Sequence, residues 1–188
     1  MKTIQLTPSC KDYLWGGEKL RTEYGIQSEL HPLSEAWMLS CHPDGPSYLP
    51  DGSTFQQYIN THPGCLGTHC EKFSEFPVLA KLIDAKKDLS IQVHPSNEYA
   101  LEHEHQYGKT EMWYVLDCEP GAFLYYGFDH EISREELEER IRNNTLTEVL
   151  NAVPVKKGDC FFIPSGTLHA ICKGVVVVEV QQTSNVTY

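Results

Sequence analysis

The chain has 188 residues, of which 40% are hydrophobic, and its formal net charge at pH 7 is −11. A chain of this length can bury a sizeable core, and no Ser/Gly-rich linker or low-complexity run divides it, so we expect a single domain over residues 1–188. The acidic balance argues against a nucleic-acid partner, because the sequence has no basic stripe that could follow a phosphate backbone.

The sequence before residue 107 contains two short segments with helical patterns. Residues 54–60 place their apolar side chains on one face and predict a short helix. Residues 97–106 predict a second helix, and its His103 and His105 would diverge, so we interpret them as solvated. Just before it, residues 92–94 are expected to form a strand.

The second half alternates short apolar runs with turn residues. The runs at 112–116, 161–163 and 175–178 predict strands. Residues 133–151 begin with a capping-box sequence and continue with apolar residues at helical spacing, which predicts an inserted helical hairpin or pair. The short strands, frequent turns and lack of a strand–helix–strand rhythm favour a mainly β fold, a double-sheet jelly roll that can hold a ligand between its sheets.

No segment indicates export or a membrane span. The N-terminal segment has too few apolar residues for a signal peptide, and no stretch approaches the roughly 18 to 20 apolar residues that cross a bilayer. Seven cysteines without paired spacing indicate reduced thiols. We therefore expect a soluble cytoplasmic protein with no membrane partner. A second zinc site at His62, Cys65, His69 and Cys70 is conceivable, but the spacing fits no common zinc finger, and packed cysteines with loop histidines are favoured.

Groups able to bind a metal occur in three separate segments. In a strand, side chains two positions apart share a face, so Gln92 and His94 can reach one cavity. Glu111 opens one apolar run and His169 follows another. Each residue alone reads more simply as a polar side chain at a strand end, but together they form a plausible ligand set. Imidazole combined with a carboxylate suits zinc or another divalent first-row metal, and we expect one ion per chain.

Several motifs resemble one enzyme family. They are Asp12 to Gly17, Ser34 to Trp37, Asp88 to Pro95, Gly108 to Val115, Val155 to Ala170 and Glu179 to Asn185. In this order they are similar to the type I mannose-6-phosphate isomerases, a family with the cupin-type double-stranded β-helix. The resemblance runs from near the N-terminus to the last residue and implies interconversion of mannose 6-phosphate and fructose 6-phosphate through a cis-enediol.

The resemblance also implies roles for individual residues. Gln92, His94, Glu111 and His169 match the family's metal ligands, usually zinc. Lys81, Ser90, Lys109 and Glu179 match residues that line its sugar-phosphate pocket. The reaction needs a base near the moving proton and a cation near the oxygens, so Lys109 and Glu179 are the candidates for proton transfer. Lys81 and Ser90 suit phosphate contacts.

The aromatic residues permit two interpretations. Trp15, Trp37 and Trp113 could stack on the apolar face of a sugar, or they could belong to the core. Trp113 shares a strand face with Glu111, so cavity lining and core packing are equally expected for it. Trp15 is the better candidate for the pocket rim, and we expect Trp37 to be structural.

The sequence departs from the family pattern at its end. In the family the last motif continues into an arginine thought to be catalytic and then into a second cupin-like domain, whereas this sequence stops at Tyr188. Losing one such positive group typically costs on the order of a hundredfold in rate. Two hypotheses follow: a metal-dependent mannose-6-phosphate isomerase, or a non-catalytic cupin that binds a metal and a sugar phosphate. We keep open a homo-oligomer in which a neighbouring subunit completes the pocket.

Overall fold

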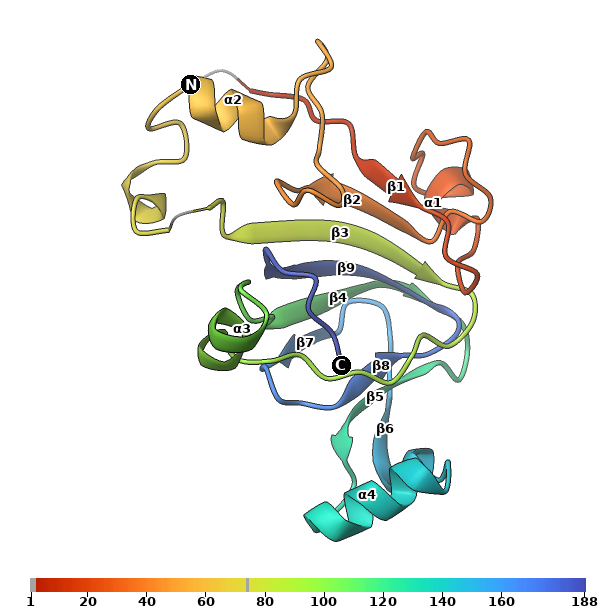
Figure 1. Cartoon of the computed structure of the whole chain (residues 1–188). Helices are drawn as coiled ribbons and strands as arrows, with labels where there is room; N and C mark the ends of the chain where they lie inside the picture. The colour runs from red at the N-terminus through yellow and green to blue at the C-terminus, as the bar shows by residue number, and fades with distance from the viewer. Residues whose placement is uncertain (1–2, 74) are drawn as a thin grey trace.

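The computed structural model describes residues 3–73 and 75–188, and within them two antiparallel sheets pack against each other (Figure 1). The larger sheet has the strand order β1-β2-β3-β9-β4-β7, and the smaller has the order β6-β5-β8. The strands are β1 (Ser9–Lys11), β2 (Glu35–Leu39), β3 (Val78–Ala85), β4 (Glu111–Cys118), β5 (Phe123–Phe128), β6 (Leu150–Pro154), β7 (Cys160–Ile163), β8 (His169–Ile171) and β9 (Val175–Gln182). The predicted strands within β4, β7 and β9 are thus confirmed.

The helices are short and lie outside the sheets (Figure 1). They are α1 (Lys19–Thr22), α2 (Phe55–Thr61), α3 (Asn97–His103) and α4 (Arg134–Arg142), with 3₁₀ turns at Thr68–Cys70 and Leu146–Val149. Helix α2 begins with a capping box, in which the Thr54 hydroxyl accepts the Gln57 N–H and the Gln57 side chain accepts the Thr54 N–H. Helix α3 ends three residues earlier than expected. Helix α4 and the second 3₁₀ turn connect β5 to β6.

The hydrophobic core lies between the two sheets. Ile83, Val115 and Val177 from the larger sheet pack with Leu124 and Ile171 from the smaller one, and each is at most 1% exposed. Within single strands the core residues alternate, as with Trp113 and Val115 in β4 or Val175 and Val177 in β9, which is the pattern of a sheet with one buried face. Among the helices that the structure describes, none is long and apolar enough to cross a membrane.

Cross-strand pairing carries polar residues onto the same inner face. In the register of the larger sheet, Trp37 pairs with Lys81, Lys81 with Glu179, and Glu179 with Trp113. This row runs across four strands, and all four residues are buried. Because directly paired residues share a face, these four side chains lie next to one another on the inner face of the larger sheet.

The segment expected to be a strand at residues 92–94 does not form one. Gln92 makes only an isolated bridge to His169, and Val93 instead exchanges backbone hydrogen bonds with Tyr188, at 2.9 and 3.0 Å. The two sides of the segment therefore pair with different parts of the chain, and Pro95, which has no N–H, cannot extend either pairing. The prediction of a regular strand here was wrong, although the backbone is bridged on both sides.

Candidate metal centre and adjoining pocket

His94, Glu111 and His169 meet in the interior, although they come from three separate segments. His94 lies in the connection before α3, Glu111 begins β4, and His169 begins β8. Their ligand atoms all lie within 4.8 Å of one another, and the residues are 0 to 2% exposed. The two Nε2 atoms are 3.2 Å apart, and the Glu111 carboxylate oxygens lie 3.5 Å from His94 Nε2 and 3.3 Å from His169 Nε2.

Hydrogen bonds at Nδ1 orient both histidine rings so that the lone pair of each Nε2 points into the cluster. His94 Nδ1 lies 3.1 Å from the Val186 carbonyl oxygen, and His169 Nδ1 lies 2.8 Å from that of Thr167. A carbonyl can only accept, so each Nδ1 must carry the proton and each Nε2 is left unprotonated in the neutral ring. This second contact on the ring is the usual way in which a ligating histidine is oriented. Burial lowers the pKa of His169, which further favours the neutral form.

The Glu111 carboxylate is buried yet remains ionised. Neither oxygen has a hydrogen-bond donor of acceptable geometry among the described residues, although the Lys109 ammonium lies 2.6 Å from Oε2. Burial acts to raise the pKa of Glu111, but the charge of the neighbouring Lys109 ammonium opposes it and the pKa is lowered. A buried carboxylate with free lone pairs between two imidazole nitrogens suits a cation.

The spacing of these atoms can be compared with a metal site. Ligand atoms placed about 2.0 to 2.1 Å from a tetrahedral ion are about 3.3 Å from each other. The two Nε2 atoms, 3.2 Å apart, agree with that value, and each histidine faces a different oxygen of the Glu111 carboxylate, at 3.5 Å for Oε2 and 3.3 Å for Oε1. The cluster could therefore hold a metal ion with a position left for a further ligand.

A pocket of about 210 Å³ adjoins the cluster and collects the other predicted residues. Lys81, Lys109 and Glu179 lie in its buried part, Trp15 and Gln92 are half-buried, and Ser90 is exposed. Tyr13, Glu35, Trp37, Asn185 and Thr187 also line it, and the predicted residues do not include them. The structure therefore brings the predicted residues to one place.

Two lysines flank one carboxylate oxygen in this pocket. Lys81 Nζ lies 3.0 Å from Glu179 Oε1 and 3.8 Å from Glu35 Oε2. Lys109 Nζ lies 3.8 Å from the same Glu179 oxygen and 2.8 Å from His94 Nε2. Burial acts to lower the pKa of Lys81, but Glu179 and Glu35 outweigh it and the pKa is raised. Lys81 is therefore a permanent cation at the floor of the pocket.

Two tryptophans fix the carboxylates of this network. Trp113 Nε1 donates to Glu179 Oε2 at 2.9 Å, and Trp37 Nε1 donates to Glu35 Oε2 at 2.7 Å. Trp113 is 1% exposed and belongs to the core. Its ring therefore packs in the core while its N–H contacts the site. Trp37, expected to be structural, also lines the pocket. Alternation along β2 was the signal that could have identified Glu35.

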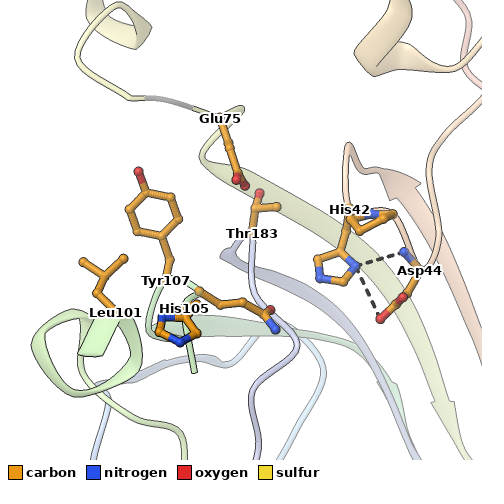
Figure 2. Close-up of a pocket in the computed structure, with 9 residues that line it drawn as sticks. His42, Asp44, Glu75, Leu101, His105, Tyr107 and Thr183 are labelled. Carbon is orange, nitrogen blue, oxygen red and sulfur yellow. Dashed lines mark hydrogen bonds and ion pairs between the residues drawn. The ribbon is translucent and has the colours of Figure 1, made fainter. Parts of the chain in front are cut away.

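A second cavity, of about 400 Å³, is lined in part by Asp44 (Figure 2). Figure 2 shows His42, Glu75, Tyr107 and Thr183 around it, with His42 in contact with Asp44. Asn185, which lines the pocket beside the metal cluster, donates from Nδ2 to Asp44 Oδ2 at 3.3 Å. His105, expected to be solvated, is exposed and lines this cavity.

The cysteines are free thiols in the structure, and two of them have strongly raised pKa values. All seven are unpaired, and burial raises the pKa of Cys41 to about 12 and that of Cys172 to about 11. A thiol with so high a pKa is a poor nucleophile at neutral pH, which argues against a reactive role for these two.

Comparison with known proteins identifies the family. A family model described as phosphomannose isomerase type I, catalytic domain, matches residues 3–121. The chain belongs to this family. A mannose-6-phosphate isomerase from Streptococcus mutans is 42% identical over 179 residues, which cover 93% of this chain and 56% of that protein. The chain thus spans less than two thirds of the length of this relative.

Solved structures of phosphomannose isomerases share the fold. The crystal structure of the mannose 6-phosphate isomerase from Bacillus subtilis superimposes with a TM-score of 0.93 at 39% identity, covering all of this chain and 60% of that one. A mannose 6-phosphate isomerase bound with zinc and yttrium has a TM-score of 0.75 at 20% identity, over 98% of this chain and 69% of that one. The predicted mainly β cupin fold and the resemblance to the family are both confirmed.

Proposed function

We propose that this chain is the catalytic region of a zinc-dependent isomerase that interconverts mannose 6-phosphate and fructose 6-phosphate through a cis-enediol. The observation that carries the proposal is the buried His94, Glu111 and His169 cluster, which opens beside a pocket holding Lys81, Lys109 and Glu179. Membership of the phosphomannose isomerase family supports the substrate assignment.

The donor set suits zinc. Two neutral imidazoles and one carboxylate are typical zinc ligands, and the Gln92 amide oxygen is the candidate for a fourth. When bound, zinc would supply a Lewis acid that polarises the substrate oxygens at C1 and C2. The site has three carboxylates (Glu35, Glu111, Glu179) and two ammonium groups (Lys81, Lys109), so its formal charge is −3 + 2 = −1. A divalent ion reverses this sign and makes the pocket receptive to a phosphate.

The remaining residues bind the sugar phosphate and move its proton. We assign Lys81 and Ser90 to the phosphate and Trp15 to the face of the sugar. Isomerisation transfers one proton from C2 to C1 and another between the two oxygens. Glu179 and Lys109 flank the pocket and are assigned these transfers as general base and acid. Trp113 orients the Glu179 carboxylate by its indole N–H.

A coupled isomerase assay on the zinc-reconstituted chain tests this proposal. We expect turnover of mannose 6-phosphate that is lost after chelation and regained with zinc. Glu111→Gln should lose zinc and turnover together, whereas Glu179→Gln should retain one zinc per chain and lose turnover. Lys156→Met, at an exposed position, is the control.

A different outcome would favour the second candidate function. The chain covers 56% of the S. mutans relative and 60% of the B. subtilis structure. A chain that holds one zinc, binds mannose 6-phosphate in a calorimeter and shows no turnover would be a binding cupin. No zinc and no sugar-phosphate binding would contradict both functions.

A further inference from the structure

The last six residues fold back over the metal cluster. After β9 the chain turns and ends beside the connection between β3 and α3 (Figure 1). We call residues 183–188 the C-terminal strap. Tyr188 exchanges two backbone hydrogen bonds with Val93, the neighbour of His94 in the sequence. The Val186 carbonyl oxygen lies 3.1 Å from His94 Nδ1, and Thr187 Oγ1 lies 3.4 Å from the same nitrogen. The strap therefore supplies the contacts that orient this ring from its Nδ1 side, while the Lys109 ammonium lies 2.8 Å from Nε2 on the other side.

The strap is anchored at its start by one side-chain amide. Gln181 Nε2 donates to the carbonyl oxygens of Gln182 at 2.9 Å and Ser184 at 2.7 Å. The Ser184 N–H also donates to the Gln182 carbonyl at 2.8 Å, and the Ser184 hydroxyl accepts the Val186 N–H at 3.3 Å. These contacts close a tight turn, and the turn sets where the Val186 carbonyl lies.

Gln181 faces the metal cluster. It is paired with Glu111 in the register of β9 and β4, so the two side chains share the inner face of the sheet. The residue is 4% exposed, and its Oε1 has no hydrogen-bond partner among the described residues. Leaving a buried amide oxygen unpaired is unfavourable, so an apolar side chain would suit this position better if packing were its only role. Its N–H groups, which donate to Gln182 and to Ser184 in the turn where the strap begins, account for an amide here.

We propose that Gln181 is a positioning residue of the metal centre. Its amide fixes the turn at residues 182–184, the turn fixes the Val186 carbonyl, and that carbonyl holds His94 with Nδ1 protonated and Nε2 facing Glu111 and His169. The inference rests on the proposed zinc site. His169 is oriented separately, by the Thr167 carbonyl, so the strap acts on one of the two histidines.

This difference between the histidines provides an internal control. Long-range ¹H–¹⁵N spectra of the metal-free protein at pH 8 report which ring nitrogen carries the proton. In the wild type we expect both His94 and His169 to be protonated on Nδ1. In Gln181→Met, which keeps the length of the side chain and removes its N–H donors, the His94 signals should shift toward a mixture of tautomers. The His169 signals should stay unchanged.

Zinc affinity, measured by competition with a chromophoric chelator, is the second readout. We expect Gln181→Met to weaken zinc binding by about 10- to 100-fold, the usual effect of losing a partner that orients a metal ligand. Gln56→Met, at a half-buried position on α2, is the matched control and should bind zinc as the wild type does. If Gln181→Met does not fold, Ser184→Ala tests the same turn by removing the acceptor of the Val186 N–H.

The possible failures are distinguishable. A wild-type protein that binds no zinc contradicts the proposed function itself. Wild-type zinc binding combined with unchanged tautomers and affinity in folded Gln181→Met or Ser184→Ala overturns the role of Gln181. Equal changes at His94 and His169 would also overturn it, because they would indicate a general loss of structure.

Discussion

At the scale of single residues, the site depends on charges buried next to their counter-ions. Lys81 is 7% exposed and Glu179 is 3% exposed, and the two lie 3.0 Å apart. Removing a buried ammonium leaves carboxylates without compensation in a poorly solvated place. This arrangement makes Lys81 important for stability as well as for substrate binding.

Lys81→Met should therefore destabilise the fold strongly. Glu179 and Glu35 would lose the cation between them, and we expect the free energy of unfolding in urea to fall by about 3 to 5 kcal/mol. Lys156→Met, at an exposed position, should change it by less than about 0.5 kcal/mol. Equal effects of the two substitutions would contradict a buried charge network.

A second residue, His42, is expected to make the free energy of unfolding depend on pH. Burial lowers its pKa below the ordinary 6.5, while Asp44 and Glu75 oppose the shift. The unfolded state therefore binds the proton more readily. His42 contributes stability above about pH 6.5, and this contribution is lost as the pH falls through the folded-state pKa. In chelator-treated protein, unfolding free energies between pH 8 and 5 should decline less for His42→Asn than for the wild type, and an equal decline would refute this contribution.

At the scale of elements, the turn between α3 and β4 joins two parts of the metal centre. Gly108 stands just before Lys109 and Glu111, and it packs against the backbone that follows His94. A Cβ at this glycine would lie 2.5 Å from the Ser96 carbonyl carbon and 2.6 Å from both the Asn97 nitrogen and the Pro95 oxygen. Backbone atoms cannot move aside as a side-chain tip can, so the two segments need a glycine here.

The substitution Gly108→Ala should push the turn before β4 away from the backbone at residues 95–97. Overpacking of this kind costs about 1 to 3 kcal/mol, and the displacement of His94 relative to Glu111 should weaken zinc binding as well. Urea unfolding and zinc competition measure the two effects, with Thr110→Ala as the neighbouring control. Unchanged zinc affinity in Gly108→Ala would show that the turn does not set the spacing of the ligands.

At the scale of the whole molecule, the metal cluster adds a second link between the two sheets, which the core already joins, and includes the connection before α3. Glu111 belongs to the larger sheet, His169 to the smaller one, and His94 to the connection before α3. An ion bound by all three would act as a cross-link between the sheets. Binding to the native state alone also stabilises a protein by mass action.

Zinc should therefore raise the melting temperature. At a free zinc concentration 100 times the dissociation constant, the stabilisation is about 2.7 kcal/mol, which for a chain of this size is about 5 to 10 °C. Calorimetry with and without a chelator measures the shift, and Glu111→Gln should abolish it. The same shift in Glu111→Gln would place the ion elsewhere, for example at the cysteines and histidines of residues 62–70.

Local patterns were enough to predict several elements. The helix expected at residues 54–60 is observed as Phe55–Thr61, because the Thr54 capping box acts within one turn. The strands at 161–163 and 175–178 follow from apolar runs that a sheet can bury. The metal-binding residue types and the family motifs were likewise visible in the sequence, since both depend on which residues are present and in what order.

Tertiary structure decided what those residues contact. Glu35 enters the pocket only because β2 pairs with β3, and the Val186 carbonyl reaches His94 across 92 positions of sequence. Residues 92–94 are bridged on both sides without forming a strand, because Gln92 pairs with His169 and Val93 with Tyr188, two separate parts of the chain that only the tertiary structure brings there. The sequence by itself determined the chemistry available, the periodicity and the family. Strand register and long-range pairing decided where each functional group lies, because the contacts of these groups depend on how distant segments pack together.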